Sequence, residues 1–161
     1  MKTITYTNAK LKKLLQRHTD FNEKCTIHLN DKSYVVLDAN WLKNEAYPAY
    51  YKWLSFAGIT EWRTNWDCDN FAQTFKTFLN ILHARENSLT FTERSKSNKK
   101  NFTEAEAVAV GTMSYNNSAR SAHAINMVIG KNNELLFFEP DGGDFLNLNK
   151  KQKESIWYLN F

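Results

Sequence analysis

A long amphipathic helix that begins at a cysteine constrains the fold of this chain more than any other segment. Its apolar side chains recur at helical spacing: Cys68, Phe71, Ala72, Phe75, Phe78, Leu79 and Leu82. Such a stripe is typical of a helix that buries one whole side. Asp67 is suited to cap the helix, and the positive end of the helix dipole stabilises a thiolate. The pattern therefore predicts a largely buried helix with a nucleophile in its first turn.

The spacing of apolar side chains also predicts the remaining elements. Helical spacing predicts short helices over 8–18 and 48–58, and the run 25–38 predicts two short strands around a turn. Apolar runs in the second half predict strands over 107–115, 122–130, 134–140 and 156–161. The polar, basic segment 93–102 is typical of a loop. This order predicts an α+β domain in which helices pack on an antiparallel sheet.

Length and composition limit the class of protein. The 161 residues fit one domain, 1–161, and a hydrophobic fraction of 42% is enough for one core. The net charge of +4 is spread along the chain, without the dense basic and aromatic face that favours nucleic acid. Only two cysteines occur, Cys25 and Cys68, which is too few for a disulfide-rich secreted scaffold. Without a leader-like or membrane-spanning apolar run, we expect a cytoplasmic, reduced protein with neither membrane nor nucleic acid as its partner.

A cysteine, a histidine and an acid stand in an order that suits nucleophilic catalysis. His123 begins an apolar strand and Glu139 ends the next one, so a hairpin of these strands would bring the two side chains together. The carboxylate would orient the imidazole, and His123 would take the proton of Cys68 and later return it. Asp141 is an alternative acid, because it points to the same side of an extended strand as Glu139. We therefore predict Cys68 as nucleophile, His123 as general base and acid, and Glu139 as orienting acid.

These motifs resemble those of a known superfamily. The stretches "DCDNFA", "HAINMVI" and "LLFFEPDGG" are similar to patterns in papain-like and transglutaminase-like cysteine peptidases. The pattern is closest to the peptidase-like domain at the C-terminus of a fungal agglutinin and to related small bacterial and phage proteins. The resemblance covers 65–145 and leaves 1–60 without a matched motif. It implies a papain-like fold, the triad named above, and calcium held by the carboxylates of Asp67 and Asp69.

The donor of an oxyanion hole stays open at this point. Papain-like enzymes usually place a glutamine shortly before the cysteine, and none is present here. Asn65, the indole of Trp62 and the backbone N–H of Cys68 are the candidate donors. Trp62 and Trp66 are also candidates to wall the substrate cleft.

Two functions from different classes follow from these observations. The first is a cysteine-dependent hydrolase or acyl transferase acting on protein amide bonds, as a peptidase, deamidase or transglutaminase-like enzyme with a protein or peptide substrate. The alternative is a non-catalytic binding protein with a papain-like fold, of phage or mobile-element origin, which inhibits a host protein; the missing glutamine favours it. Nucleic-acid binding by the loop 94–100 is a weaker third reading. Thiol reactivity separates the first two, because an enzyme-like Cys68 is a thiolate at neutral pH and a relic thiol is inert.

Overall fold

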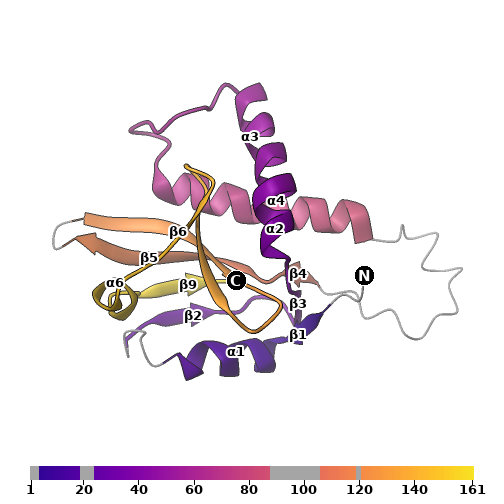
Figure 1. Ribbon diagram of the computed structural model, residues 1–161, viewed down its shortest axis with the longest axis vertical. Coiled ribbons are helices and arrows are strands. Elements are labelled where there is room, and N and C mark those ends of the chain that lie inside the picture. Colours follow the sequence, from indigo (N-terminus) through magenta and orange to yellow (C-terminus); the bar gives the residue numbers. More distant parts are fainter. Residues whose placement is uncertain (1–3, 19–23, 88–105, 119–120) are drawn as a thin grey trace, which may run out of the picture.

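Two mixed β-sheets and the helices that cover them make up the fold (Figure 1). The computed structural model describes residues 4–18, 24–87, 106–118 and 121–161. Within these ranges the elements are β1 (Thr5–Thr7), α1 (Asn8–Arg17), β2 (Thr26–His28), β3 (Ser33–Val35), α2 (Ala39–Trp41), the π-helix η1 (Leu42–Ala46), α3 (Tyr47–Phe56), α4 (Cys68–Asn87), β4 (Ala107–Val108), β5 (Val110–Ser118), β6 (Ser121–Ile129), β7 (Leu135–Glu139), β8 (Asp144–Leu146), α6 (Lys150–Glu154) and β9 (Tyr158–Asn160). One sheet has the order β1-β3-β4 and the other β2-β9-β5-β6-β7-β8.

The six-stranded sheet has a helical layer on each face. Because side chains alternate along a strand, Ile125 and Met127 of β6 join the buried cluster that contains Leu11 of α1. Val128 of the same strand joins the cluster that contains Phe75 of α4. Figure 1 shows α3 standing across α4 on one side of the strands and α1 on the other. None of the described helices has the length and apolar character needed to cross a membrane.

The helix predicted from Cys68 is confirmed as α4, which runs from Cys68 to Asn87. The apolar positions of its stripe are buried, from Phe71 in its first turns to Leu82 near its end. Phe75 stacks on Phe138 of β7, with ring centroids 5.1 Å apart. This stacked pair fixes the height of α4 over the sheet. The start of the helix is thereby set beside the strands that carry the other predicted site residues.

The hairpin predicted in the second half is confirmed as β6 and β7, which pair antiparallel. Asn133 takes the left-handed conformation in the turn between them, with φ 62°, a conformation that Asn tolerates better than most residues. The helices predicted over 8–18 and 48–58 are confirmed as α1 and α3. The loop predicted over 93–102 lies outside the described residues.

The predicted sheet arrangement, with helices first and one antiparallel sheet after them, is wrong. Strands from the first third of the chain enter both sheets, and two of the pairings are parallel: β2 with β9 and β3 with β4. The α+β class is corrected accordingly to a β-rich fold with two mixed sheets. The short strands predicted within 25–38 and 156–161 are present, but their partners lie far away in the sequence, so local patterns did not reveal the pairings.

Candidate functional site

A tight turn delivers the chain to the start of α4. Arg63 and Trp66 exchange backbone hydrogen bonds of 2.8 and 3.0 Å. The carbonyl of Asp67 then accepts from the N–H of Phe71 at 3.1 Å, and the N–H of Asp67 donates to the side-chain oxygen of Asn70 at 3.2 Å. These bonds satisfy backbone groups that a helix start leaves unpaired. They place Cys68 in the first turn of α4, as predicted.

The sulfur of Cys68 lies against the backbone of β6. Burial raises the pKa of the half-buried Cys68 thiol, the Ala124 backbone N–H lowers it, and the negative charges of Asp67 and Asp69 raise it. The net direction is upward, because burial is the largest contribution. The backbone N–H groups at the helix start and on β6 therefore do not outweigh the effect of burial on the pKa of Cys68. This differs from the low pKa expected of a poised nucleophile.

His123 and Glu139 form a close pair at the neighbouring ends of β6 and β7. Their Nε2 and Oε2 atoms lie 2.5 Å apart, and the side chains are 26% and 17% exposed. The pairing of Asn126 with Phe138, continued along the strands, sets Glu139 diagonal to His123 on the same face. The hydrogen bond that His123 donates to Glu139 raises the pKa of His123, and desolvation opposes it. The imidazolium is therefore favoured by this contact.

Glu139 is the acid that contacts His123, and Asp141 is not. Asp141 is exposed, and its backbone carbonyl accepts a hydrogen bond from the Tyr47 hydroxyl at 3.2 Å. Burial and the charge of Glu139 raise the pKa of Asp141, while His123 lowers it. Asp141 thus adds to the negative field near His123 without orienting the ring.

The structure brings Cys68 next to the His123–Glu139 pair without joining them. Ala124, which contacts the Cys68 sulfur, follows His123 directly on β6. Among the described residues no hydrogen bond links Cys68 to the imidazole, whose Nε2 is already occupied by Glu139. Cys68 therefore lies beside the His123–Glu139 pair without a hydrogen bond to it.

Two residues that the sequence analysis did not single out complete the surroundings. Tyr115, which is 1% exposed, packs its ring edge-on against His123 at 5.8 Å. Its pKa is raised by burial and then by the nearby charges of Glu139 and Cys68. Asn126 is fully buried on β6 and donates to the carbonyl of Ala72 on α4 at 2.9 Å. A polar residue within the apolar run "HAINMVI" was the signal that could have found Asn126.

The carboxylates on either side of Cys68 approach each other. A hydrogen bond with Asp67 is the main cause that raises the pKa of Asp69, and burial and the charge of Asp67 add to it. One ligand atom from each of Asp67, Cys68 and Asp69 lies within 4.8 Å of the others. The amide of Asn70 is engaged by the backbone. Two carboxylates, one with the unpaired buried oxygen Asp67 Oδ1, fit part of the oxygen shell that a hard cation such as calcium requires.

The predicted cleft residues take different positions. Trp62 and Asn65 are exposed in the turn before α4. Trp66 is half-buried and packs its ring edge-on against Phe71 at 6.1 Å. Its indole Nε1 is buried without a hydrogen-bond partner. Of Trp62 and Trp66, the two tryptophans predicted to line the cleft, it is Trp66 whose buried indole N–H is available to donate a hydrogen bond.

Unpaired buried polar atoms lie on or next to the elements that carry Cys68, His123 and Glu139. In the described part of the chain, the buried side-chain nitrogen or oxygen atoms without a partner are Trp66 Nε1, Asp67 Oδ1, Asn126 Oδ1 and Glu139 Oε1. Trp66 and Asp67 directly precede α4, Asn126 is on β6, and Glu139 ends β7. We call these four residues, together with Cys68 and His123, the Cys68 cluster. Because buried polar groups are paired in most of a folded protein, these exceptions mark a candidate site.

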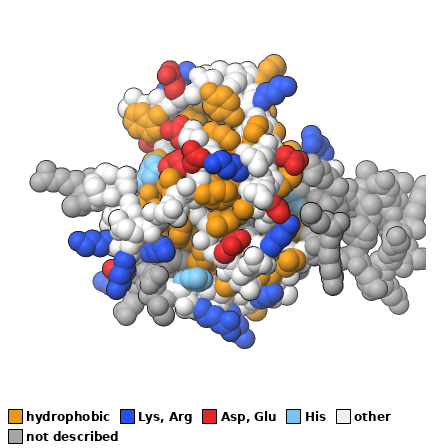
Figure 2. All heavy atoms as spheres, in the orientation of Figure 1, with side chains coloured by type: hydrophobic (Ala, Val, Ile, Leu, Met, Phe, Trp, Pro, Cys, Tyr) orange, Lys and Arg blue, Asp and Glu red, His pale blue; other side chains and the backbone are white. Residues whose placement is uncertain are grey.

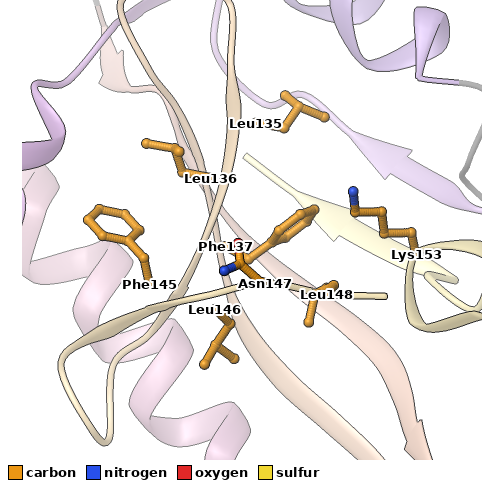
Figure 3. A pocket seen from close by; sticks show the side chains of 8 residues that line it. All are labelled: Leu135, Leu136, Phe137, Phe145, Leu146, Asn147, Leu148 and Lys153. Carbon is orange, nitrogen blue, oxygen red and sulfur yellow. The ribbon is translucent and has the colours of Figure 1, made fainter. Parts of the chain in front are cut away.

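Two clefts elsewhere in the molecule do not include the Cys68 cluster. One, of about 160 Å³, lies where β7 and β8 diverge, and Leu136, Phe145 and Leu148 are among its lining residues (Figure 3). Lys153 reaches into it from α6. The second, of about 520 Å³, lies along α1. The Cys68 cluster is thus defined by its unpaired groups and its charges.

Solved structures with the same fold belong to a lectin. One of them, "PSL1a-E64 complex", is 19% identical with a TM-score of 0.66, over 98% of this chain and 50% of that chain. The structure of Polyporus squamosus lectin bound to the human-type influenza-binding epitope Neu5Aca2-6Galb1-4GlcNAc is 20% identical, with a TM-score of 0.66 over 98% and 49%. The chain therefore spans about half the length of the structures it matches. No protein-family model and no curated protein matches it.

These matches correct the family predicted from the motifs. The assignment to papain-like or transglutaminase-like cysteine peptidases, near the fungal agglutinin peptidase-like domain and small bacterial and phage proteins, is withdrawn with the fold class that it implied. The matched structures are those of a lectin. Each motif is only a few residues long, so it predicts where one thiol or acid lies in a helix or strand but is not specific to one family.

The predicted activity is corrected with the family. The cysteine-dependent hydrolase or acyl transferase, its cysteine-protease character and its protein or peptide substrate are withdrawn, because one matched structure is that of a lectin bound to a glycan epitope. The physical reason is that a thiol and a His–acid pair do not by themselves specify a reaction. The positions of Cys68, His123 and Glu139 come from the structure of this chain and do not depend on the withdrawn family.

Proposed function

We propose that this chain is a ligand-binding protein and that its ligand binds at the Cys68 cluster. The observation that carries this proposal is that the segments around Cys68, His123 and Glu139 hold four buried polar atoms without a hydrogen-bond partner. Leaving such a group unpaired costs about 1–3 kcal/mol. A ligand whose polar groups pair with these atoms recovers that free energy, so the cluster favours a bound state.

The unpaired atoms define the chemistry of the ligand. Three of them are oxygens that accept hydrogen bonds, in Asp67, Asn126 and Glu139, and one is the N–H donor of Trp66. A ligand rich in hydroxyl groups matches this set, because each hydroxyl donates once and accepts as well. The glycan epitope bound in the matched lectin structure is a ligand of that class. We therefore place a hydroxyl-rich glycan first among the ligands of this chain.

Titration calorimetry with the trisaccharide Neu5Aca2-6Galb1-4GlcNAc, followed by a panel of neutral glycans, tests this proposal. We expect saturable binding to at least one glycan. Glu139→Gln should weaken it roughly tenfold, which corresponds to about 1.4 kcal/mol. Glu154→Gln is the matched control, because Glu154 is exposed on α6 away from the cluster. Absence of binding across the panel, or equal losses in both variants, contradicts glycan binding at this site.

Covalent capture at Cys68 is a second candidate function. The thiol lies beside the His123–Glu139 pair, and one matched structure is a complex with E64. In this mode the Cys68 sulfur forms a bond to an electrophilic carbon of the ligand, the leaving group departs with its electron pair, and His123 Nδ1 takes the thiol proton. Cys68, His123 and Glu139 are the reactive groups of this proposal, which involves binding without turnover.

Iodoacetamide labelling tests the second candidate. In a Cys25→Ser background only Cys68 can be alkylated, and the step exchanges iodide for a sulfur–carbon bond. We expect His123→Ala to slow labelling at neutral pH roughly tenfold, and E64 to add a mass that survives denaturation. A labelling rate that depends on pH as for an ordinary thiol, with a pKa of about 8.5, in both proteins contradicts covalent capture. Glycan binding is tested separately by the calorimetry above.

Calcium belongs to this proposal through the two carboxylates beside Cys68. Calcium favours roughly six to eight oxygen ligands, so Asp67 and Asp69 would supply only part of the shell and ligand or water the rest. Because calcium binds ionised carboxylates and the pKa of Asp69 is raised, calcium binding should displace a proton, and affinity should rise with pH. Calorimetry in two buffers of different ionisation enthalpy measures the number of protons that calcium binding releases. Identical heats in wild type and Asp69→Asn contradict a calcium site here.

A reducing cytoplasm is the location that suits this site. Both Cys25 and Cys68 are free thiols, and reduced thiols persist where glutathione keeps disulfides from forming. Labelling of Cys68 by a cell-permeant maleimide before lysis checks this location. A Cys68 that is already oxidised in the cell contradicts it.

A further inference from the structure

We infer that a basic cleft along α1 binds a small ligand that carries two phosphate or sulfate groups. The cleft has a volume of about 520 Å³, and its polar lining residues are Thr7, Lys10, Lys13, Arg17 and Asn133. We call these five residues the α1 cleft. It lies apart from the Cys68 cluster, because α1 covers the face of the sheet opposite to α4.

The cations of the α1 cleft are held on one stripe of a firmly anchored helix. Leu11 and Leu15 are fully buried and fix one side of α1 to the core. Lys10, Lys13 and Arg17 follow at intervals of three and four residues on an exposed side. Lys10 and Arg17 are about 10 Å apart along the helix axis, at 1.5 Å per residue. This spacing suits two anionic groups better than one.

The turn between β6 and β7 supplies the opposite wall of the cleft. Asn133 is held there in the left-handed conformation, with φ 62°. Its side-chain oxygen accepts a hydrogen bond from the buried hydroxyl of Tyr6, which leaves the Nδ2 hydrogens to donate. The ammonium of Lys10 lies 3.7 Å from the centroid of the Tyr6 ring, a cation–π contact that helps to position it. Tyr6 therefore orients two of the cleft's donors.

The α1 cleft offers donors and positive charge together. Lysine, arginine, the Asn133 amide and the Thr7 hydroxyl all donate hydrogen bonds, and none of the described residues that line the cleft is acidic. Figure 2 shows Lys and Arg side chains gathered at the lower side of the molecule, where Figure 1 places α1. Charge-assisted bonds from Lys and Arg to phosphate or sulfate oxygens are among the stronger hydrogen bonds.

The size of the cleft selects a small molecule over a single inorganic ion. Small-molecule sites typically have volumes of about 300–1,000 Å³, and 520 Å³ falls within this range. A sugar with a phosphate at each end and a disaccharide with two sulfates share the required chemistry, because both hold their anionic groups apart. The two sources differ in the tetrahedral centre, so their simple probes are fructose 1,6-bisphosphate and a disulfated disaccharide.

Titration calorimetry with each probe at low ionic strength tests the inference. The cleft variant is the triple substitution Lys10→Gln, Lys13→Gln and Arg17→Gln. Its matched control removes the same charge from exposed positions outside the cleft, by Lys12→Gln, Lys52→Gln and Lys151→Gln. We expect the cleft variant to bind at least one probe roughly tenfold more weakly, about 1.4 kcal/mol, and the control to lose less than about twofold. Binding of the sugar bisphosphate alone assigns a phosphate ligand, and binding of the disaccharide alone assigns a sulfated one.

A single substitution in the opposite wall gives a second readout. Asn133→Gly removes the amide and keeps the left-handed backbone accessible, and urea unfolding measured beside it reports the loss of the Tyr6 hydroxyl's partner. It should weaken binding by about threefold without changing the net charge. No saturable binding of either probe, or an equal loss in the cleft variant and its charge-matched control, overturns the inference in favour of a generally basic surface.

Discussion

The side-chain amide of Asn126 on β6 donates a hydrogen bond of 2.9 Å to the carbonyl of Ala72 on α4. The same amide lies 3.3 Å from the carbonyl of Gly111 on β5. Ala72 stands one turn beyond Cys68, and Asn126 stands three residues beyond His123. This buried side chain therefore ties the helix that carries the thiol to the strand that carries the histidine. It determines how close the two groups can come.

Replacement of Asn126 by alanine should destabilise the protein. The substitution removes the two hydrogen bonds of the buried Asn126 amide, and each hydrogen bond contributes about 0.5–1.5 kcal/mol to stability. Urea denaturation measures the loss. Asn116→Ala on β5 is the matched control, since its side chain is exposed and should change stability by less than about 0.5 kcal/mol. Equal effects in the two variants would show that the Asn126 amide has no special role.

The His123–Glu139 pair should make stability depend on pH in a defined direction. The pKa of His123 is raised in the folded protein, so the folded state holds its proton more tightly than the unfolded state does. The stabilisation is complete below the unfolded pKa of about 6.5 and is lost as pH rises through the raised pKa.

The test of this pair compares wild type with Glu139→Gln in urea across the range from about pH 6 to pH 9. The difference in the free energy of unfolding should be largest at the acid end and shrink as the pH increases. Titration of the His123 ring by NMR should show a lower pKa in the variant. A difference that grows with pH contradicts this sign.

Removal of negative charge beside Cys68 should lower the pKa of its thiol. The charges of Asp67 and Asp69 both raise that pKa, so Asp67→Asn should increase the thiolate fraction at neutral pH. Alkylation rates against pH, in a Cys25→Ser background, measure the shift. Asp144→Asn, an exposed position on β8, is the control. A slower reaction in Asp67→Asn would mean that its carboxylate helps the thiol in some other way.

Two glycines in the same backbone conformation should respond differently to alanine. Gly58 and Gly143 have φ values of 75° and 74°, so both substitutions incur the left-handed penalty of about 1–2 kcal/mol. A Cβ at Gly58 meets nothing within 4 Å, whereas one at Gly143 overlaps the ring of Tyr47. Gly143→Ala should therefore cost roughly 1–3 kcal/mol more. Thermal or urea unfolding checks this, and equal losses would show that Tyr47 moves aside freely.

The Gly143 substitution should also be felt at the candidate site. The N–H of Gly143 donates to the carbonyl of Glu139 at 2.8 Å, so a displaced turn moves the acid that pairs with His123. The NMR-measured pKa of His123 should fall in Gly143→Ala and stay unchanged in Gly58→Ala. This outcome would separate a local rearrangement from a general loss of stability.

The order of helices and strands around Cys68 was readable from sequence because its signals are local. The apolar stripe from Cys68 to Leu82 repeats at the helical period, and the two apolar runs around Asn133 lie close enough to form a hairpin. That hairpin brings His123 and Glu139 together through its register alone. The Cys–His–acid arrangement was therefore predictable as far as its neighbours in the sequence define it.

Only the tertiary structure decided the sheet pairings, the state of the thiol and the location of the unpaired polar atoms. The parallel pairing of β2 with β9 joins Thr26 to Tyr158, residues too far apart for any local period to link. The pKa of Cys68 rises because burial outweighs the helix end, and burial is a sum over the whole fold. Local periodicity could specify a helix, a hairpin and a thiol at a helix start, because each depends on a few neighbouring residues. What surrounds that thiol depends on which distant segments pack against it, and that is decided only when the chain has folded.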